Sequence, residues 1–388
     1  MTTTIDNEQK TLNVPNLRFP EFEGEWEETR LKEISKFSKK RLNSIELSCS
    51  NYVTTENMLQ DYKGIVSATN LPTNTNVVKF SKGDVLLSNI RPYLKKVWYA
   101  DKNGGCSADV FVFKALPICD SNFLHHVIAN DRFIKFVMGG AKGVKMPRGD
   151  KEQMITYKVG LPCIEEQKKI ANLLSLLDER ISTQNKIIED LKKLKCAIIE
   201  KLYSEIQGKE YLYGQLFEVV NRRNKQMEYS NILSASQEKG MVNRDDLNLD
   251  IQFERSNINT YKIVRAGDYV IHLRSFQGGF AFSDKLGVCS PAYTILRPNC
   301  LLEYGYLSYY FTSHRFIKSL IIVTYGIRDG RSINIEEWLN MKVIIPPKEH
   351  QLHTLKILRS LEGKIENEET YTICLSNQKQ YLLQQMFI

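Results

Sequence analysis

The sequence predicts an α+β protein in which two mixed α/β domains, each followed by a long helix, are related by a pseudo-two-fold internal repeat. The first observation behind this prediction is the repeat itself. Lys82-Gly83-Asp84-Val85 returns about 184 positions later as Ala266-Gly267-Asp268-Tyr269, and Val159–Pro162 returns as Val343–Pro346. Further matching pairs are Cys106-Ser107 with Cys289-Ser290, Arg132-Phe133 with Arg315-Phe316, and Gln167 with Gln351. A repeat of whole domains indicates a molecule that performs one task twice.

Two long heptad-patterned segments are the second observation. After Pro162-Cys163 the chain has no Pro or Gly until Gly208, and its apolar positions recur at alternating steps of four and three, as in a coiled coil. This seam comprises Ile170, Leu174, Leu177, Ile181, Gln184, Ile188, Leu191, Lys195, Ile198 and Leu202. The second seam comprises Thr354, Leu358, Leu361, Ile365, Glu368, Thr372, Leu375, Lys379, Leu382 and Met386. The polar interruptions match, so we expect the two helices to form an antiparallel coiled coil on the order of 60 Å long.

Turn and strand signals inside the globular segments are the third observation. Phe80–Ile90 and Tyr261–Leu273 each combine a Gly-Asp turn with an apolar run, which is typical of a turn followed by a strand. Further strands are predicted over Asp109–Lys114 and Ala292–Leu296, and helices over Asp120–Met138 and Tyr304–Ile322. The predicted organisation is a first domain over 1–163, a central spacer helix over 164–206, a second domain over 207–346 and a C-terminal spacer helix over 347–388.

Composition places the chain among ordinary globular proteins. It has 388 residues, of which 42% are hydrophobic and 25% are charged, enough for two substantial cores. The eight cysteines form no C-x-x-C pair, so neither a zinc site nor a disulfide framework is predicted. No apolar run reaches membrane-spanning length and the first residues are polar, so we expect a soluble, cytoplasmic protein.

The net charge of +8 lies in the two globular segments. Residues 1–160 hold 23 Lys or Arg against 18 Asp or Glu, residues 209–346 hold 17 against 14, and the two helical segments balance. Basic side chains that neutralise phosphates release condensed counterions. A basic excess confined to matching domains therefore favours a polyanionic partner.

A motif opens each long helix. The first copy reads Val-Gly-Leu-Pro-Cys-Ile-Glu-Glu-Gln-Lys-Lys-Ile over 159–170, and Pro346-Pro347-x-Glu349-x-Gln351 echoes it. The second copy departs from the first, with His350 for the second Glu and Thr354 for the Ile. Together with the turn–strand signal and a Gly-x-x-x-x-Arg loop, both present twice, essentially the whole chain resembles the specificity subunit of a type I restriction–modification system.

The resemblance implies a division of labour. Each globular segment would be a target recognition domain that reads half of a split, asymmetric site in double-stranded DNA, and the paired helices would fix the gap between the halves. The helices would also dock two methyltransferase (modification) subunits, which use S-adenosylmethionine to methylate adenine N6. Separate motor-nuclease (restriction) subunits would use ATP. The specificity subunit itself would be non-catalytic and bind no cofactor.

The sequence lacks the motifs of such enzymes. It has neither an Asn/Asp-Pro-Pro-Tyr/Phe methyltransferase tetrapeptide nor a G-x-x-x-x-G-K-[ST] phosphate loop. His350 and His353 have no acidic or cysteine partners in the pattern, so we expect solvated side chains and no metal site. An independent enzyme is therefore disfavoured.

Candidate DNA contacts are basic and amide side chains in loops that the repeat makes equivalent. Arg, Gln and Asn can make paired hydrogen bonds to guanine and adenine edges, whereas Lys more often contacts phosphates. In the first domain the candidates are Arg91, Lys95, Lys96, Lys142, Lys145 and Arg148. In the second they are Arg274, Ser275, Gln277, Arg328 and Arg331. A second group comprises Asn70, Asn89, Arg222 and Arg223, and for each single residue a solvated position is the open alternative.

Helix residues outside the seam are candidates for docking the methyltransferases. They are Lys168, Lys169, Leu173, Leu176, Glu179, Arg180 and Ile187, with a solvated helix surface as the alternative. Two other functions stay open. One is a coiled-coil scaffold that joins protein-binding domains, against which the segregated charge argues. The other is the recognition subunit of another restriction–modification class, since the same domains would serve it.

Overall fold

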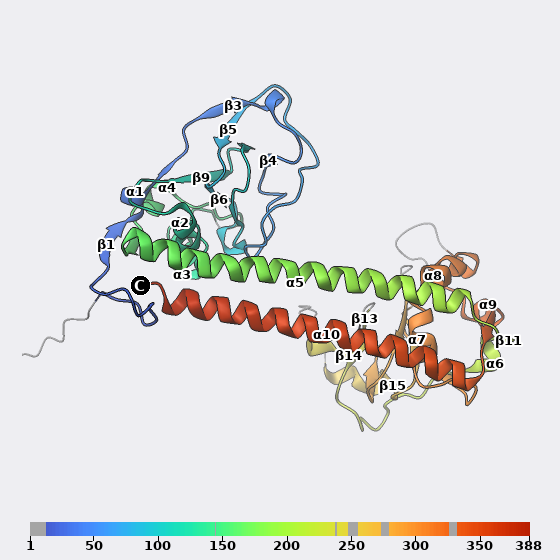
Figure 1. Cartoon of the computed structure of the whole chain (residues 1–388). Coiled ribbons are helices and arrows are strands. Elements are labelled where there is room, and N and C mark those ends of the chain that lie inside the picture. The colour runs from blue at the N-terminus through green and yellow to red at the C-terminus, as the bar shows by residue number, and fades with distance from the viewer. Residues whose placement is uncertain (1–12, 144, 237–238, 247–254, 273–278, 326–331) are drawn as a thin grey trace, which may run out of the picture. The chain divides into compact units, whose positions relative to one another are not determined.

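The computed structural model describes residues 13–143, 145–236, 239–246, 255–272, 279–325 and 332–388. They divide into two compact units. Unit 1 comprises the described residues up to Lys186 together with Thr370–Ile388, and unit 2 comprises those of Ile187–Glu369. Each unit combines short strands with helices (Figure 1), so the predicted mixed α+β class is confirmed. No described helix is both long and apolar enough to span a membrane.

Unit 1 consists of short strands, short helices and parts of two long helices. Its strands are β1 (Glu27–Arg30), β2 (Ser35–Phe37), β3 (Arg41–Asn43), β4 (Tyr52–Val53), β5 (Asn76–Phe80), β6 (Val85–Ser88), β7 (Val97–Tyr99), β8 (Gly104–Cys106), β9 (Val110–Ala115) and β10 (Lys158–Leu161). Its short helices are α1 (Leu31–Ile34), α2 (Ser121–Ile128), α3 (Asp131–Gly139) and α4 (Lys151–Met154), with 3₁₀ turns η1 (Ser44–Glu46) and η2 (Pro92–Leu94). The long helices α5 (Ile164–Ser204) and α10 (Lys348–Gln385) contribute to both units.

Two four-stranded sheets form the globular part of unit 1, in the orders β2-β9-β6-β7 and β3-β5-β8-β4. Strand β6 is buried at every residue, because successive side chains point to opposite faces and both faces are covered. Val85 and Leu87 lie in one hydrophobic cluster with α1, α2 and α3, whereas Leu86 lies in another with Phe80 and Trp98. The ribbon of β1 and β10 leads directly into α5.

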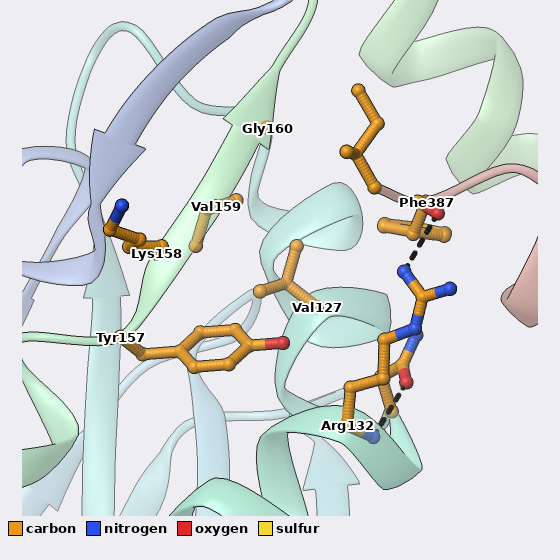
Figure 2. A pocket seen from close by; sticks show the side chains of 9 residues that line it. Val127, Arg132, Tyr157, Lys158, Val159, Gly160 and Phe387 are labelled. Carbon is orange, nitrogen blue, oxygen red and sulfur yellow. Dashed lines mark hydrogen bonds between the residues drawn. The ribbon is translucent and has the colours of Figure 1, made fainter. Parts of the chain in front are cut away.

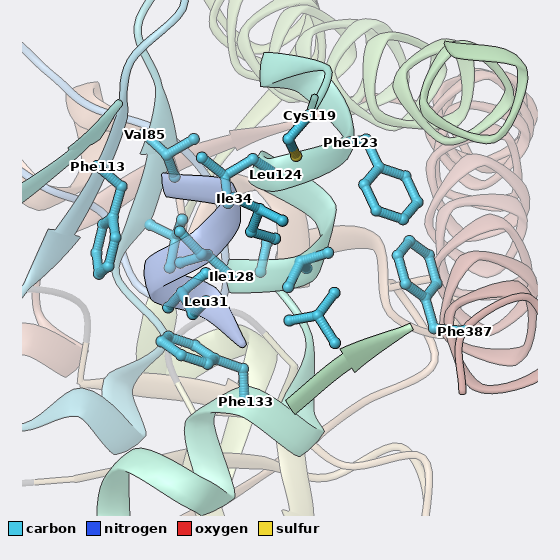
Figure 3. Packing of buried hydrophobic residues seen from close by; sticks show 14 of the residues in the cluster. Leu31, Ile34, Val85, Phe113, Cys119, Phe123, Leu124, Ile128, Phe133 and Phe387 are labelled. Atoms are coloured by element: carbon cyan, nitrogen blue, oxygen red, sulfur yellow. The ribbon is translucent and has the colours of Figure 1, made fainter. Parts of the chain in front are cut away.

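The main core of unit 1 joins these helices to the sheet (Figure 3). Leu31 and Ile34 of α1 and Phe133 of α3 are fully buried in it. Phe123 of α2 stacks on Phe387, with ring centroids 5.3 Å apart. Burial of one such side chain stabilises a fold by about 1.5–3 kcal/mol. The end of the chain is therefore an integral part of the core of unit 1.

Unit 2 has the same kinds of elements. Its strands are β11 (Lys209–Leu212), β12 (Phe217–Val220), β13 (Leu233–Ser236), β14 (Gly240–Asn243), β15 (Lys262–Val264), β16 (Tyr269–Ile271), β17 (Phe280–Phe282), β18 (Gly287–Cys289), β19 (Thr294–Pro298), β20 (Thr324–Tyr325), β21 (Ser332–Ile333) and β22 (Lys342–Ile345). Its helices and 3₁₀ turns are α6 (Tyr213–Leu216), α7 (Tyr306–Tyr310), α8 (His314–Ser319), α9 (Ile335–Leu339), η3 (Arg244–Asp246), η4 (Arg255–Thr260) and η5 (Leu320–Val323).

The sheet β12-β19-β16-β17 of unit 2 is also covered on both faces. Tyr269 and Ile271 lie in the larger cluster, which contains Trp338 stacked on Tyr213 at 4.2 Å between centroids. Val270, between them, lies in the other cluster. The ribbon β11–β22 precedes α10, as β1–β10 precedes α5.

The two ranges predicted to be helical, 120–138 and 304–322, each contain more than one short helix. The first range holds α2 and α3, and the second holds α7, α8 and η5. The side chain of Asn130 accepts a hydrogen bond from the backbone N–H of Arg132 and begins α3. Ser313 accepts one from the N–H of Phe316 and begins α8. Each cap residue divides an apolar pattern that looks continuous in the sequence.

Both Gly-Asp turns are held by their aspartate. The glycine of each turn has a positive φ, 87° at Gly83 and 94° at Gly267, which favours glycine. Asp84 pairs with Lys114 at 2.8 Å. Asp268 accepts two hydrogen bonds from Arg297, both at 2.9 Å. The buried carboxylates therefore fix the turns, and their partners lie on the neighbouring strands β9 and β19.

Within each unit, α5 and α10 run antiparallel and are tied by ion pairs (Figure 1). In unit 1, Asp178 pairs with Lys379 at 2.5 Å. In unit 2, Lys195 pairs with Glu362 at 2.5 Å, and Lys192 pairs with Glu369 at 2.7 Å. Every seam position named from the sequence is buried or half-buried.

A buried glutamine fixes the start of each long helix. The Oε1 atom of Gln167 accepts a hydrogen bond from the N–H of Asp120 at 2.8 Å. Its Nε2 atom donates to the carbonyls of Ile118 at 3.1 Å and Pro162 at 2.9 Å. Gln351 makes the corresponding three bonds in unit 2 at 2.8, 2.9 and 3.0 Å. Each amide thereby joins a helix to its globular part through both of its N–H donors and one lone pair of its oxygen.

Candidate nucleic-acid interface

Two loops of unit 1 that carry predicted DNA contacts are joined through their backbones. The N–H of Arg91, after β6, donates a hydrogen bond to the carbonyl of Pro147 at 2.8 Å. The second loop is closed on itself, because Lys142 and Arg148 exchange two backbone hydrogen bonds at 3.0 Å. The structure thus brings the first predicted group of cations next to the second.

The first loop has an unusual backbone. Arg91 and Lys95, on either side of η2, have left-handed φ values of 51° and 53°. A neighbouring loop supports them, since the N–H groups of Asp61 and Tyr62 donate to the carbonyls of Leu94 and Lys95 at 3.1 and 3.0 Å. Asp61 and Tyr62 are themselves left-handed, at 54° and 62°. Such residues persist where their surroundings over-determine them, and they cluster at functional sites.

Two of the predicted DNA-contacting side chains of the first loop already have partners within unit 1. The Nζ atom of Lys95 lies 2.8 Å from a carboxylate oxygen of Asp131 and 5.9 Å from the ring centroid of Tyr62. The Nζ atom of Lys96 donates to the carbonyl of Thr55 at 2.6 Å. Both side chains are half-buried. Their ammonium groups therefore stabilise the loop.

Lys142 and Arg148 of the second loop form exposed ion pairs. Lys142 lies 2.5 Å from Asp150, and this hydrogen bond lowers the pKa of Asp150 and raises the pKa of Lys142. Arg148 lies 3.5 Å from Asp109. Exposed pairs of this kind contribute less than about 1 kcal/mol. An incoming phosphate could replace either carboxylate at little cost.

Arg91 and Lys145 differ from the other four candidates. Both side chains are exposed, and among the described residues neither guanidinium nor ammonium has a partner. Their charges are therefore available to a ligand.

Sequence reasoning missed two apolar side chains at this site. Tyr93, inside η2, and Met146, directly before Pro147, are each 48% exposed. The predicted DNA contacts were all basic, amide or hydroxyl residues. The usable signal was an aromatic residue two positions after Arg91 and a methionine directly after Lys145, inside loops rich in basic residues.

The remaining predicted contacts are scattered or undescribed. Arg274, Ser275, Gln277, Arg328 and Arg331 lie outside the described residues. Of the second group, Asn70, Arg222 and Arg223 are exposed. Asn89 is half-buried, and its Oδ1 atom is buried without a hydrogen-bond donor. Arg223 bridges to Lys262, so the two lie side by side on unit 2.

A buried polar cluster lies where α2 meets the long helices in unit 1. The rings of His125 and His126 are 4.8 Å apart, and Asn122 donates to Ser175 of α5 at 2.8 Å. Burial, with a smaller effect of the nearby Lys379, lowers the pKa of His125 to about 3. Burial also lowers the pKa of His126 well below its usual value. In the described part of the chain, no three His, Cys, Asp or Glu side chains gather as metal ligands.

Arg132 ties α3 to the end of α10 (Figure 2). Its guanidinium donates to the carbonyl of Phe387 at 3.0 Å and to that of Gln384 at 3.2 Å. Val127 and Tyr157 line the same small cavity. The last carbonyls of a helix have no partner in the helix itself, so this arginine acts as a cap. The role of Arg132 is thus structural.

The proposed docking residues have unequal surroundings. Leu176 and Ile187 are 55% and 41% exposed, and Lys168 and Glu179 are exposed as well. Leu173 instead packs half-buried against the core of unit 1, so it is not part of a free surface.

The other two docking candidates are engaged within unit 1. Lys169 pairs with Glu21 and lies 4.6 Å from the ring centroid of Phe19. Arg180 lies 5.6 Å from the ring centroid of Tyr371. Exposed apolar side chains on α10 extend the possible surface, notably Ile373 at 60% and Tyr381 at 58%.

Comparison with known proteins gives a consistent result. Residues 23–193 match the family described as Type I restriction modification DNA specificity domain. The chain is similar to the Type I restriction enzyme MjaVIII specificity subunit of Methanocaldococcus jannaschii, with 29% identity over 203 residues, 51% of this chain and 46% of the relative. The Type I restriction enzyme EcoDI specificity subunit of Escherichia coli is 24% identical over 129 residues, 32% of this chain and 29% of the relative. These matches span about half or less of each relative.

Two solved structures share the fold. The S subunit of a type I restriction–modification system from M. genitalium has a TM-score of 0.57 at 15% identity, covering 97% of this chain and 99% of that one. A chain from a structure on assembly and conformational transition of the type I system has a TM-score of 0.57 at 17% identity, covering 92% and 96%. At these identities the likeness shows the fold alone.

Proposed function

We propose that the chain reads a split, asymmetric site in double-stranded DNA, on the premise that residues 23–193 match the DNA specificity domain of type I restriction–modification systems. Specificity subunits of this kind recognise DNA and leave the chemistry to other subunits, so the chain is not itself an enzyme. The observation that carries the proposal is the joined pair of basic loops within the matched residues. They present Arg91 and Lys145, whose charged groups have no partner within the part of the chain that the structure describes.

Reading in two halves is supported by the equivalence of the units. Gln167 and Gln351 each join a long helix to its globular part, and we call them the glutamine clamps. They, and the turns held by Asp84 and Asp268, occupy positions of the sequence that repeat after 184 residues. The proposed target recognition domains are 1–163 and 207–346. Because their loops differ in sequence, the two half-sites would differ as well, which makes the complete site asymmetric.

The long helices are proposed to form an antiparallel coiled coil that sets the gap between the half-sites. The buried seam residues and the ion pairs within each unit support this role. The proposed spacer helices span 164–206 and 347–388. Two domains that contact one duplex must respect its helical repeat, so the length of the spacer would select the number of base pairs between the halves.

The same helices are proposed to dock the partner subunits. Two methyltransferase subunits would bring S-adenosylmethionine, and motor-nuclease subunits would bring ATP, so the chain needs no cofactor of its own. Leu176, Ile373 and Tyr381 are the apolar side chains that such a partner would cover. An exposed apolar patch on a helix is a usual site of protein association. The complex would work on DNA in the cytoplasm.

The test is site selection by the assembled complex. The full chain is expressed with its methyltransferase subunits, incubated with a pool of random duplex DNA at several salt concentrations, and the bound fraction is sequenced. We expect two short, unlike motifs at a fixed distance, with affinity that falls as salt rises. An assembled complex that retains DNA without any motif would contradict the proposal and favour a scaffold role.

A further inference from the structure

We propose that the turn Arg91–Lys95 is the base-reading element of unit 1, in which Arg91 recognises a guanine edge and Tyr93 and Met146 contact the methyl group of a neighbouring thymine. The inference rests on the proposed DNA-recognition function and deepens it. It divides residues that look equivalent in the sequence into base readers, phosphate contacts and internal supports.

The turn is held in one conformation before any ligand arrives. Arg91 and Lys95 are left-handed, a conformation that is unfavourable for a non-glycine residue and that the surrounding structure must stabilise. The supports are the bonds from the N–H groups of Asp61 and Tyr62 and the bond from the Arg91 N–H to the Pro147 carbonyl. Four of the six left-handed non-glycine residues in the described chain thus lie in these two interlocked loops. Rigid placement of a few side chains is what sequence discrimination needs.

The basic residues of the first loop fall into two classes. Lys95 and Lys96 point inward to Asp131 and the Thr55 carbonyl, so they hold the loop. Arg91 has its backbone fixed while its guanidinium remains exposed and unpartnered among the described residues. A guanidinium can donate two parallel hydrogen bonds to O6 and N7 of guanine, which an ammonium cannot.

Two exposed apolar side chains lie on the same two joined loops as Arg91. Tyr93 lies two residues further along the same turn, and within the described residues its ring packs on no other ring. Met146 immediately precedes Pro147, whose carbonyl binds the Arg91 backbone. Both are 48% exposed, although neither contributes to a core. The thymine methyl group is the apolar feature of the major groove, so an arginine flanked by apolar groups suits a guanine next to a thymine.

Lys145 has a different role in the same loop. It is exposed and unpartnered in the described structure, but its ammonium is a point charge without the fork of arginine. We assign it to the phosphate backbone, together with Lys142 and Arg148, whose exposed ion pairs are easily exchanged. Phosphate contacts raise affinity for every sequence alike.

The test compares methylation motifs in cells that carry the methyltransferase subunits and one version of the full chain. The versions are the wild type, Arg91→Ala, Arg91→Lys, Tyr93→Ala, Met146→Ala and Lys145→Ala, with Lys135→Ala on α3 as an exposed basic control outside the site. Methylated adenines are mapped by single-molecule sequencing. Chain abundance is measured in parallel, so that loss of protein is separated from loss of recognition.

Arg91→Ala and Arg91→Lys should relax one position of one half-site by about tenfold or more and leave the other half unchanged. Tyr93→Ala and Met146→Ala should relax an adjacent position. Lys145→Ala should lower the methylated fraction without changing the motif, and Lys135→Ala should change neither. If the Arg91→Ala variant fails to accumulate, the Arg91→Lys variant provides the test, because it keeps the positive charge and removes only the parallel N–H donors of the guanidinium.

An unchanged motif in both Arg91→Lys and Tyr93→Ala would overturn the base-reading assignment. The proposed function would survive that result, because a motif would still depend on the chain. A wild-type chain that produces no motif at all would instead refute the function on which the assignment rests.

Discussion

Lys195 and Lys379 lie 184 positions apart in the sequence, and each ammonium group lies 2.5 Å from a carboxylate of the other long helix. The carboxylates belong to Glu362 and Asp178, which are also 184 positions apart. The sequence showed the two lysines as matching interruptions of an apolar seam. The structure gives each interruption an acidic partner of its own, on the neighbouring helix and inside its own unit.

Removal of one partner of the Lys379–Asp178 ion pair should lower the free energy of unfolding of unit 1 strongly. Lys379 is 6% exposed, so Asp178→Ala would leave a buried ammonium without its counter-ion. We expect a loss of about 2–3 kcal/mol in the free energy of unfolding of unit 1. Urea unfolding can report on unit 1 alone in a Trp338→Phe background, because the remaining tryptophans, Trp26 and Trp98, lie in that unit.

The control for this prediction is an exposed pair on the same helix. Lys193 and Glu189 are four residues apart and 2.7 Å from each other, and both are exposed, so Lys193→Ala should leave the stability nearly unchanged. The double change Asp178→Leu with Lys379→Met should recover most of the loss. An equal loss in the free energy of unfolding for Asp178→Ala and Lys193→Ala would show that the burial of Lys379 does not make the loss of its counter-ion more destabilising.

The glutamine clamps should be equally important in both units. Gln167→Leu would leave an N–H and two carbonyls without partners in a buried place, at a cost of about 2–3 kcal/mol. Gln351→Leu should cost a similar amount in unit 2, followed by the fluorescence of Trp338. Lys168→Leu, next to the first clamp and exposed, is the matched control and should be nearly neutral. A tolerated Gln167→Leu would mean that water replaces the amide.

Unit 1 should lose stability on mild acidification. In the unfolded chain His125 and His126 titrate near pH 6.5, whereas in the fold burial lowers the pKa of His125 to about 3 and lowers that of His126 as well. The unfolded state therefore binds more protons as the pH falls from about 6.5 towards 3, and stability is lost over this window. Unit 1 should therefore be less stable at pH 5 than at pH 7.5.

One variant separates this effect from other acid effects. Burial raises the pKa of Asp178, so the folded form takes up its proton more readily and partly opposes the loss at low pH. His126→Phe should remove about one proton from the pH dependence of unfolding. A pH dependence that is the same in His126→Phe would contradict the buried neutral state of this ring.

Lengthening both long helices by one heptad should change the gap of the recognised site. Seven residues inserted after Thr183 and seven after Thr372 keep the heptad seam and add about 10 Å to each helix. At about 3.4 Å per base pair, we expect about three more base pairs between unchanged half-sites. Motif mapping in cells gives the gap directly. An unchanged gap, with the complex assembled, would argue against a spacer role.

The sequence was most informative where a pattern had one physical meaning. A heptad pattern sustained over about 40 residues has few alternatives to a long helix, and α5 and α10 follow it. The Gly-Asp turns were equally readable, because a positive φ before a carboxylate that must bind nearby N–H groups is a local requirement. Helix ends were less readable. Asn130 and Ser313 divide apolar patterns, and a single polar residue inside a periodic run does not reveal whether it caps or merely faces solvent.

The site was predictable only in outline. The repeat pointed to two loops that lie next to each other in unit 1, but charge alone could not separate Lys95 and Lys96, which turn inward, from Arg91, which does not. That difference depends on Asp131 and the Thr55 carbonyl, which are distant in the sequence. The bond between Arg18 and Glu166 was also beyond sequence reasoning. Arg18 makes two contacts of 2.8 Å with this buried carboxylate, and unit 2 has His350 in the corresponding position.

The most direct test of DNA recognition by this chain is a map of adenine methylation in cells that carry the matching methyltransferase subunits, with and without the chain. We predict a split, asymmetric motif that is methylated on both strands only when the chain is present. Identical methylation in the two strains, with the complex shown to assemble, would contradict the recognition role.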